Sequence, residues 1–220
     1  MLMLTVPGVY RPQTDTRLLC EALRTASVAP GAALLDVCTG SGAVAIAGAL
    51  LGARSATAVD LSRRAALTAR ANARLRRVNV RVLRGDLFGP VAGERFDVIT
   101  ANPPYVPCDR PPGAHSRARA WDAGRDGRDG IDRICAGAAE LLAPGGTLLM
   151  VHSAVCGVAE TLGTLRERNL KAAVVARRTI PFGPVMRSRA ADLKAWGLLA
   201  PGQEHEEVVV IRADRAEKRG

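Results

Sequence analysis

The feature that most limits how this chain can fold is a regular alternation of short apolar segments with longer segments rich in Ala, Leu and Arg. Short apolar runs favour strands and the longer runs favour helices, and their alternation is typical of βαβ units in a mostly parallel sheet. We expect strands at residues 33–37, 56–60, 78–84, 96–101, 147–152, 171–178 and 206–212. We expect helices at residues 14–25, 42–51, 62–75, 130–142 and 157–168. At 220 residues, the chain is long enough for one such α/β sheet with helices on both faces.

Turn and cap chemistry marks several boundaries of these elements. Ser62 follows the strand that ends at Asp60, and it suits the N-cap of the next helix. Pro144-Gly145-Gly146 is expected to end a helix and turn the chain into a strand, because Pro cannot continue a helix and Gly permits positive φ. Residues 107–129 are expected to form a long loop where a substrate would bind, and residues 179–204 a long connection with a short helical pattern at 190–196.

Composition argues against several classes of protein. The longest apolar run, residues 43–53, is shorter than the roughly 18 residues that a transmembrane helix needs. The first residues contain no basic leader followed by a sustained apolar segment, so we expect no signal peptide and a cytoplasmic location. The five cysteines form no CxxC pair and the three histidines have no zinc-ligand spacing. We therefore expect neither a metal site nor a disulfide framework.

The net charge of +10 allows two interpretations. Basic residues neutralise phosphates, so the charge could indicate a polyanionic partner such as RNA. Only three of the 31 basic residues are Lys, however, and heavy use of Arg, Ala, Gly and Pro is what a GC-rich genome produces without selection for binding. We favour the second interpretation, in which the basic stretch at residues 70–84 is a solvated surface.

The first strand leads into a helix through a turn of small residues, Cys38-Thr39-Gly40-Ser41-Gly42. Glycines permit a tight turn and a close approach of the backbone to a ligand, and the N–H groups at the start of the helix attract a negative group. Alone this signal is weak. Similar turns occur in structural loops and in dinucleotide-binding enzymes, where Gly40-x-Gly42-x-x-Ala45 would be a variant fingerprint.

Three acidic residues near this turn favour a different ligand. Asp60 ends the second strand, where its carboxylate can accept from both hydroxyls of a ribose. Asp86 follows the third strand, where it can accept from an adenine amino group while Leu87 covers a face of the ring. Asp36 is not needed for a pyrophosphate, but it suits the amino end of a methionine moiety. Together they favour S-adenosylmethionine over NAD, although Asp60 and Asp86 could each instead cap the next helix or turn.

The fourth strand is followed immediately by Asn102-Pro103-Pro104-Tyr105. The prolines fix the backbone and remove donors, so the Asn102 side-chain oxygen and the Pro103 carbonyl are left as rigid acceptors. Two such acceptors would hold both N–H bonds of an amide or exocyclic amine and aim its nitrogen at a sulfonium methyl. Tyr105 can stack on the planar acceptor group. The alternative is a Pro-rich turn that closes the strand, with Tyr105 in the core.

These residues together resemble the HemK/PrmC family of protein-glutamine methyltransferases, within the class I methyltransferases. The resemblance covers most of the chain, including VYRPQTDT at residues 9–16 and AWDAGRDGR at residues 120–128. It implies one Rossmann-like domain over residues 1–220, with a seven-stranded, mostly parallel sheet and an antiparallel last strand. Within it we expect an N-terminal helical segment (1–30), a cofactor-binding core with the NPPY loop (31–178), and a connection, last strand and charged tail (179–220).

The resemblance also implies roles for individual residues. The expected contacts of S-adenosylmethionine are Thr16, Asp36, Thr39, Gly40, Gly42, Asp60, Leu61, Asp86, Leu87 and Asn102. The expected catalytic residues are Asn102, Pro103, Pro104 and Tyr105. Tyr10, Pro12 and Trp121 are candidate substrate-side residues, and Tyr10 and Trp121 could equally fill the core.

The substrate that the resemblance implies is the glutamine amide in the GGQ loop of a translation release factor. NPPY is shared with adenine-N6 methyltransferases, so methylation of RNA or DNA is an alternative, and a non-catalytic S-adenosylmethionine-binding protein or a nicotinamide-binding oxidoreductase is a third. Cys38 departs from the family pattern, which commonly has glycine there; we expect the small Cys to be tolerated. We expect no separate N-terminal helical domain like that of the bacterial enzymes, and the length of the chain resembles the shorter archaeal and eukaryotic branch. Members of that branch can depend on a small zinc-binding activator protein.

Overall fold

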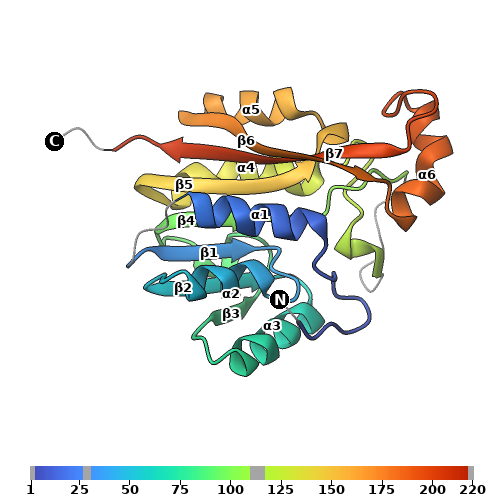
Figure 1. Ribbon diagram of the computed structural model, residues 1–220. Coiled ribbons are helices and arrows are strands. Elements are labelled where there is room, and N and C mark those ends of the chain that lie inside the picture. The colour runs from blue at the N-terminus through green and yellow to red at the C-terminus, as the bar shows by residue number, and fades with distance from the viewer. Residues whose placement is uncertain (1–2, 27–30, 110–116, 218–220) are drawn as a thin grey trace.

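The computed structural model describes residues 3–26, 31–109 and 117–217, which form a seven-stranded sheet (Figure 1). The strands are β1 (Ala33–Val37), β2 (Ser55–Asp60), β3 (Arg81–Arg84), β4 (Phe96–Ala101), β5 (Leu142–Ser153), β6 (Leu170–Pro181) and β7 (His205–Arg215). Their order is β3-β2-β1-β4-β5-β7-β6. β1 to β5 are parallel, and β7 is antiparallel to β5 and β6, as expected for the last strand. The order reverses between β1 and β4, and open α/β sheets bind ligands at the carboxyl ends of strands at such a switch point.

Helices cover both faces of this sheet (Figure 1). The helices are α1 (Thr14–Thr25), α2 (Ala43–Leu50), α3 (Arg63–Leu75), α4 (Asp129–Leu141), α5 (Val158–Glu167) and α6 (Pro184–Ala195). α1 buries Leu19 and Leu23 against Leu149 on one face, which α2 and α3 also cover. α4 and α5 lie on the other face, where Ile134 packs with Ile99. Each of these buried side chains contributes roughly 1.5–3 kcal/mol to folding.

The expected ranges of α1, β1 and β4 match the structure residue for residue. Ser62 caps α3 as expected, because its hydroxyl oxygen accepts a hydrogen bond from the Ala65 N–H at 3.3 Å. β3 is shorter than expected, because residues 76–78 form the C-terminal cap of α3 and cannot belong to the strand. Arg77 has a φ of +55°, and the Val78 N–H donates to the Ala73 carbonyl at 3.1 Å, as in a Schellman motif.

The expectation for Pro144-Gly145-Gly146 was wrong. α4 ends before this segment, at Leu141, and β5 has already begun at Leu142. The register with β4 moves from Phe96↔Leu142 to Val98↔Thr147, so residues 143–146 form a bulge inside β5. A Cβ on Gly146 would lie 2.9 Å from the Ala143 carbonyl oxygen, which only glycine avoids. Pro144 disfavours helix at Ala143, so the chain becomes extended earlier than expected.

Both expected loop regions contain regular structure among their described residues. Within residues 107–129, positions 110–116 lie outside the described residues, and the rest includes a 3-10 turn, Arg117–Ala120. In the second region, β6 continues to Pro181 and α6 follows, with Pro184 at its start, so the expected helical pattern is part of a longer helix. α6 lies beyond the ends of β6 and β7 (Figure 1) and buries Met186 and Leu193 in a small second core. None of the helices in the described part of the chain is long and apolar enough to span a membrane.

Candidate active site

The glycine turn lies at the carboxyl ends of β1 and β2, and Asp60 holds its shape. One carboxylate oxygen of Asp60 accepts from the Gly40 N–H, and the other accepts from the Ser62 N–H, each at 2.8 Å. Burial raises the pKa of Asp60, and these backbone hydrogen bonds partly offset that rise. Each oxygen keeps a second lone pair, so the same carboxylate can still accept from a ligand hydroxyl.

Asp36 is a buried carboxyl at the end of β1. It accepts hydrogen bonds from the hydroxyls of Thr39, at 2.5 Å, and Thr100, at 2.7 Å. Burial raises its pKa to about 6, although the hydroxyl groups favour the ionised form. No Lys or Arg among the described residues forms an ion pair with Asp36. A positively charged ligand nearby would therefore favour the ionised carboxylate.

The backbone of the turn is left-handed at three positions, Cys38, Gly40 and Gly42, with φ values of +56°, +56° and +85°. Gly42 also lies under α3, because an added Cβ would come within 3.0 Å of the Ala69 Cβ. Gly40 lies under Tyr10, whose Cβ would be 3.8 Å from the added atom. The turn thus needs glycine at position 42 for conformation and for packing, whereas Cys38 adopts a conformation that favours glycine.

Replacing Cys38 with Gly is expected to raise the free energy of unfolding by about 1 kcal/mol, because the left-handed strain at this position is removed. In a chain of this length, that corresponds to roughly 2–4 °C in Tm. Cys38→Ala is the matched control: it keeps the Cβ and should give no such gain. Thermal unfolding of the three proteins measures the difference, and a Tm for Cys38→Gly below that of the wild type would contradict the expectation.

Asp15, in the first turn of α1, joins the segment before this helix to the NPPY turn. It is 2% exposed. Its Oδ2 accepts from the Tyr10 hydroxyl at 2.8 Å, the Tyr105 hydroxyl at 3.1 Å and the Asn102 Nδ2 at 3.1 Å. Its Oδ1 accepts from the Thr16 N–H at 2.5 Å. Sequence reasoning did not select Asp15 as a site residue; the only signal was its place in the VYRPQTDT segment.

The NPPY turn follows β4 directly, beside the end of β1, where Val37 pairs with Ala101. Asn102 is half-buried, and its Nδ2 also donates to the Thr16 hydroxyl at 3.3 Å. The Tyr105 ring packs against the core between the sheet and α4, while its hydroxyl reaches Asp15. Gly127 allows the GRDGR segment to pack closely here, because a Cβ on it would lie 2.5 Å from the Tyr105 carbonyl oxygen. The structure thus brings Thr16 and Asn102 together and gives the Tyr105 ring core contacts.

The expected adenine-side residues lie at the carboxyl ends of β2 and β3. Asp86 is exposed and forms an ion pair of 2.6 Å with Arg133 of α4, a residue that the sequence did not single out. Leu87 is half-buried with a φ of +44°, and Leu61 is exposed. A strained backbone at Leu87 is the kind of feature that occurs at ligand sites.

The substrate-side candidates separate into two groups. Tyr10 and the half-buried Pro12 belong to the segment that crosses the glycine turn, and this segment is tied to α3 where the Leu4 N–H donates to Asn72 Oδ1 at 2.8 Å. Trp121 instead packs with the small core around α6, which includes Phe182. The Trp121 carbonyl also accepts from the N–H of Val106, directly after the NPPY turn, at 2.7 Å.

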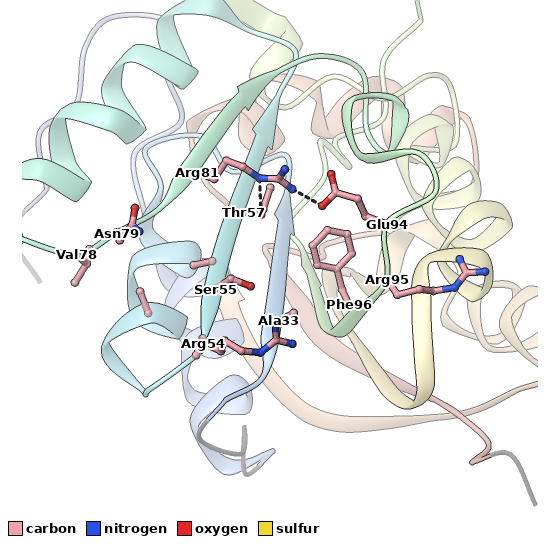
Figure 2. Close-up of a pocket in the computed structure, with 13 residues that line it drawn as sticks. Ala33, Arg54, Ser55, Thr57, Val78, Asn79, Arg81, Glu94, Arg95 and Phe96 are labelled. Carbon is pink, nitrogen blue, oxygen red and sulfur yellow. Dashed lines mark hydrogen bonds and ion pairs between the residues drawn. The ribbon is translucent and has the colours of Figure 1, made fainter. Parts of the chain in front are cut away.

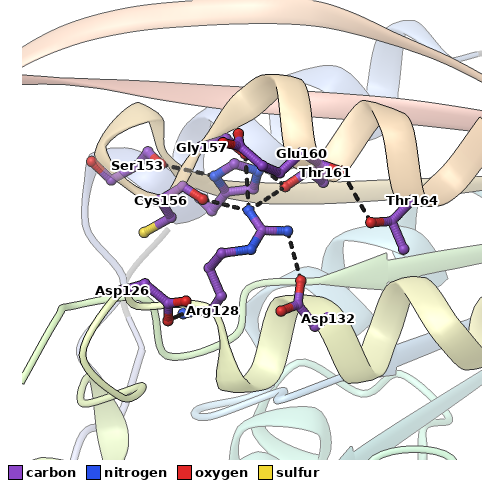
Figure 3. A network of polar contacts seen from close by, with 10 residues as sticks. Asp126, Arg128, Asp132, Ser153, Cys156, Gly157, Glu160, Thr161 and Thr164 are labelled. Atoms are coloured by element: carbon purple, nitrogen blue, oxygen red, sulfur yellow. Dashed lines mark hydrogen bonds and ion pairs between the residues drawn. The ribbon is translucent and has the colours of Figure 1, made fainter.

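Arg128 lies at the end of the AWDAGRDGR segment and organises a polar network between α4 and α5 (Figure 3). Its guanidinium donates to the Cys156 carbonyl, to the Gly157 carbonyl at 2.9 Å and to the Thr161 hydroxyl at 3.2 Å. It also forms an ion pair of 2.6 Å with Asp132, and its side chain is only 11% exposed. This arginine holds two helix starts together.

Glu206 is a second buried carboxyl on the α1 side of the site. It lies at the start of β7, 5% exposed, and its Oε2 has no hydrogen-bond partner among the described residues. Burial raises its pKa, while a hydrogen bond with the Ser153 side chain opposes that rise and the charge of Asp15 adds to it. Glu206 was not predicted as a site residue, because in the sequence it is only the first residue of an expected strand.

A pocket of about 440 Å3 lies at the opposite edge of the sheet (Figure 2). It is lined by the first residues of strands, including Ala33, Ser55 and Phe96, and by the ion pair between Arg81 and Glu94. These residues are at the amino ends of the strands, so this pocket is separate from the glycine turn and NPPY.

Comparisons with known proteins agree with this arrangement. Residues 13–103 match the family model described as ribosomal protein L11 methyltransferase (PrmA). A Methanocaldococcus jannaschii protein assigned by name to the protein N5-glutamine methyltransferases is 34% identical over 193 residues, covering 87% of this chain and 93% of that protein. The release factor glutamine methyltransferase of Moorella thermoacetica is 37% identical over 66% of this chain. The match covers 54% of that enzyme, so the chain spans about half the length of this bacterial relative.

Among solved structures, the fold is similar to that of the E. cuniculi Mtq2-Trm112 complex, which is responsible for methylation of the translation termination factor eRF1. The TM-score is 0.65 at 23% identity, and the alignment covers 95% of this chain and 99% of the matched chain. At this identity the likeness concerns the fold.

Proposed function

Since the chain belongs to the HemK/PrmC family of protein N5-glutamine methyltransferases, we propose that it methylates the side-chain amide of a glutamine in a translation release factor, with S-adenosylmethionine as the methyl donor. The main support is the position of Asn102. It follows β4 at the switch point of the sheet, and Val37 and Ala101 place it beside the glycine turn. A planar amide held there would face a ligand bound over the turn.

The residues around the turn fit S-adenosylmethionine. The buried Asp36 carboxyl has no cationic partner among the described residues and suits the positive amino end of the ligand. Asp60 suits the ribose hydroxyls, and Asp86 with Leu87 suits the adenine. We further assign Thr16, Thr39, Gly40, Gly42 and Leu61 to this site. When bound, the cofactor supplies an electrophilic methyl group on a positively charged sulfur.

Asn102 and Pro103 perform the main chemical task of the protein in this proposal. A glutamine amide is a weak nucleophile, because its nitrogen lone pair is delocalised into the carbonyl. The Asn102 Oδ1 and the Pro103 carbonyl accept the two N–H bonds and orient the nitrogen, so catalysis is positioning and charge stabilisation. Pro104 keeps the turn rigid and removes a competing donor. Tyr10, Pro12 and Tyr105 border the acceptor, and Trp121 supports the neighbouring loop.

A labelling experiment tests this function. The protein is incubated with S-adenosylmethionine labelled in the methyl group and with purified release factors, ribosomes, RNA or DNA. We expect label in a release factor, lost when the glutamine of its GGQ loop is replaced by Ala. Acid hydrolysis of the labelled protein should release methylamine, the product expected from an N-methyl amide. Label confined to nucleic acid would overturn the proposal and favour adenine methylation.

A small zinc-binding activator protein is part of the same proposal, with support from the Mtq2 structure, which was solved as a complex with Trm112. Two exposed leucines of α3, Leu67 and Leu75, offer apolar surface to such a partner. The labelling experiment is therefore run with the chain alone and with the co-expressed partner. We expect higher activity in the complex. Equal activity of the chain alone would show that it needs no activator protein.

The affinity for S-adenosylmethionine is expected to fall as the pH is lowered through about 6. A cationic ligand stabilises ionised Asp36, whose pKa is about 6 in the free protein, so acidification protonates the free form first and weakens binding. The dissociation constant should rise by up to about tenfold per pH unit below 6, until the carboxyl of the bound form is also protonated. Calorimetry between pH 5 and 8 measures this. Asp36→Asn should bind weakly with little pH dependence, whereas an identical pH profile in both proteins would exclude Asp36 from this role.

A further inference from the structure

We propose, on the premise of the function proposed above, that Asp15 is a positioning residue that decides which end of the Asn102 amide faces the substrate. The side chain of Asn102 can accept the N–H bonds of a glutamine amide only through Oδ1. Its two ends have nearly the same shape, so packing alone does not select between the two orientations. A neighbouring group that can only accept hydrogen bonds does select between them.

Asp15 is such a group. An ionised carboxylate has no donor, so the end of Asn102 that lies 3.1 Å from Asp15 Oδ2 must be the Nδ2 amine. The reversed amide would place two oxygens against each other, and that arrangement is repulsive. Asn102 Nδ2 lies 3.3 Å from the Thr16 hydroxyl, which can also donate to Asp15 Oδ1, at 3.2 Å. Because the Asp15 carboxylate can only accept hydrogen bonds, it binds the Nδ2 end of Asn102 and leaves Oδ1 free to accept from the substrate amide.

The carboxylate itself is held firmly. Tyr10 donates to Asp15 from the segment before α1, and Tyr105 donates from the turn after β4, so both sides of the acceptor site converge on one oxygen. The Thr16 N–H occupies the other oxygen. Asp15 also lies in the first turn of a 12-residue helix, where a negative charge is favoured by the helix dipole. Its charge is therefore stabilised by neutral donors, and no Lys or Arg among the described residues pairs with it.

The first test is Asp15→Asn, which keeps the shape but adds a donor that tolerates either orientation of Asn102. We expect kcat to fall by roughly 10- to 30-fold, less than for loss of Asn102 itself, because the Asn102 amide is still present. The dissociation constant of S-adenosylmethionine, measured by calorimetry, should change by less than about twofold. The matched control is Asp97→Asn, since the Asp97 carboxylate accepts the Ala33 N–H at 2.7 Å at the opposite edge of the sheet. Its kcat should equal that of the wild type.

A swap of the two side chains separates positioning from general stability. In Asn102→Asp, two carboxylates face each other. In the double variant that combines Asp15→Asn with Asn102→Asp, the amide now at position 15 can donate to one oxygen of the carboxylate now at position 102. The other oxygen of that carboxylate is then left to accept from the substrate. We expect the double variant to be at least about tenfold more active than Asn102→Asp, a difference of about 1.4 kcal/mol. Equal activity of these two proteins, or an unchanged kcat in Asp15→Asn, would overturn the proposal.

Nuclear magnetic resonance of the wild-type protein gives a readout that does not depend on activity. The side-chain amide signal of Asn102, identified by its loss in Asn102→Ala, should show slow hydrogen exchange because Asp15 accepts from it. Fast exchange at neutral pH would contradict the proposed contact even if no methyl acceptor were found. A wild type that fails to methylate any release factor while keeping this protected amide would instead count against the proposed function alone.

Discussion

Replacing Asn102 with Ala is expected to lower kcat for glutamine methylation by about 10²- to 10³-fold, the loss found when one preorganised hydrogen-bonding group is removed from an active site. The reason is that the Asn102 Oδ1 is one of two acceptors that orient the substrate nitrogen, and the Pro103 carbonyl alone cannot fix it in space. Cofactor binding relies mainly on the glycine turn and its acids in the proposed site. The increase in Tm caused by S-adenosylmethionine should therefore be largely retained.

Single-turnover transfer and thermal unfolding with and without cofactor measure these two effects separately. Asn79→Ala is the matched control, because Asn79 is exposed and lines the pocket at the amino ends of the strands. It should leave both transfer and the cofactor-induced shift unchanged. Retained activity in Asn102→Ala would remove Asn102 from its proposed role, and loss of the cofactor-induced shift would indicate that this side chain chiefly holds the cofactor.

Replacing Arg128 with Ala is expected to lower the free energy of unfolding by about 3 kcal/mol, because two carbonyls and the Thr161 hydroxyl lose a charged donor whose side chain is only 11% exposed. For a chain of this length, the fall in Tm is roughly 6–12 °C. Denaturant and thermal unfolding measure the loss. The network also sets the junction between α4 and α5 (Figure 3), so the loop that packs on Tyr105 should loosen.

The matched control for this substitution is Arg177→Ala. Arg177 forms an ion pair of 2.7 Å with Glu207, but its side chain is 54% exposed, and such surface pairs contribute roughly 0–1 kcal/mol. A loss in Arg128→Ala no larger than in Arg177→Ala would contradict the structural role. Arg128→Lys should recover only part of the stability, because an ammonium group cannot match the planar guanidinium that reaches carbonyls and Asp132 together.

The elements of the fold could largely be predicted because their patterns are local. Hydrophobic periodicity located β1 and β4, and the Ser62 cap located the start of α3. The bulge at Gly145 and Gly146 was missed although Pro144 is a local signal, because the register shift that defines the bulge depends on how β5 pairs with Phe96 and Val98 of β4, a strand far away in the sequence. The extent of α6 was missed for a similar reason: it is stabilised by packing on residues of two distant loops.

The candidate site divides in the same way. Asp36, Asp60, the glycine turn and NPPY are recognisable because each lies at the carboxyl end of a strand or directly after it, and parallel strands bring their carboxyl ends to one edge. Asp15, Arg133 and Glu206 carry no such signal. Asp15 is 87 positions away from Asn102, and Arg133 is 47 positions away from Asp86. Glu206 meets the Ser153 side chain from a different strand, so only folding brings each of these residues to its neighbour.

The amino-acid sequence by itself determined the type and order of the elements and the short motifs at the strand ends, because these depend on periodicity and on the conformational preferences of Gly and Pro. Only the tertiary structure decided which side chains meet across the sheet edge. The hydrogen bonds from Asn102 and Tyr105 to Asp15 join segments that lie 87 and 90 positions apart, and their geometry follows from how helices and strands pack.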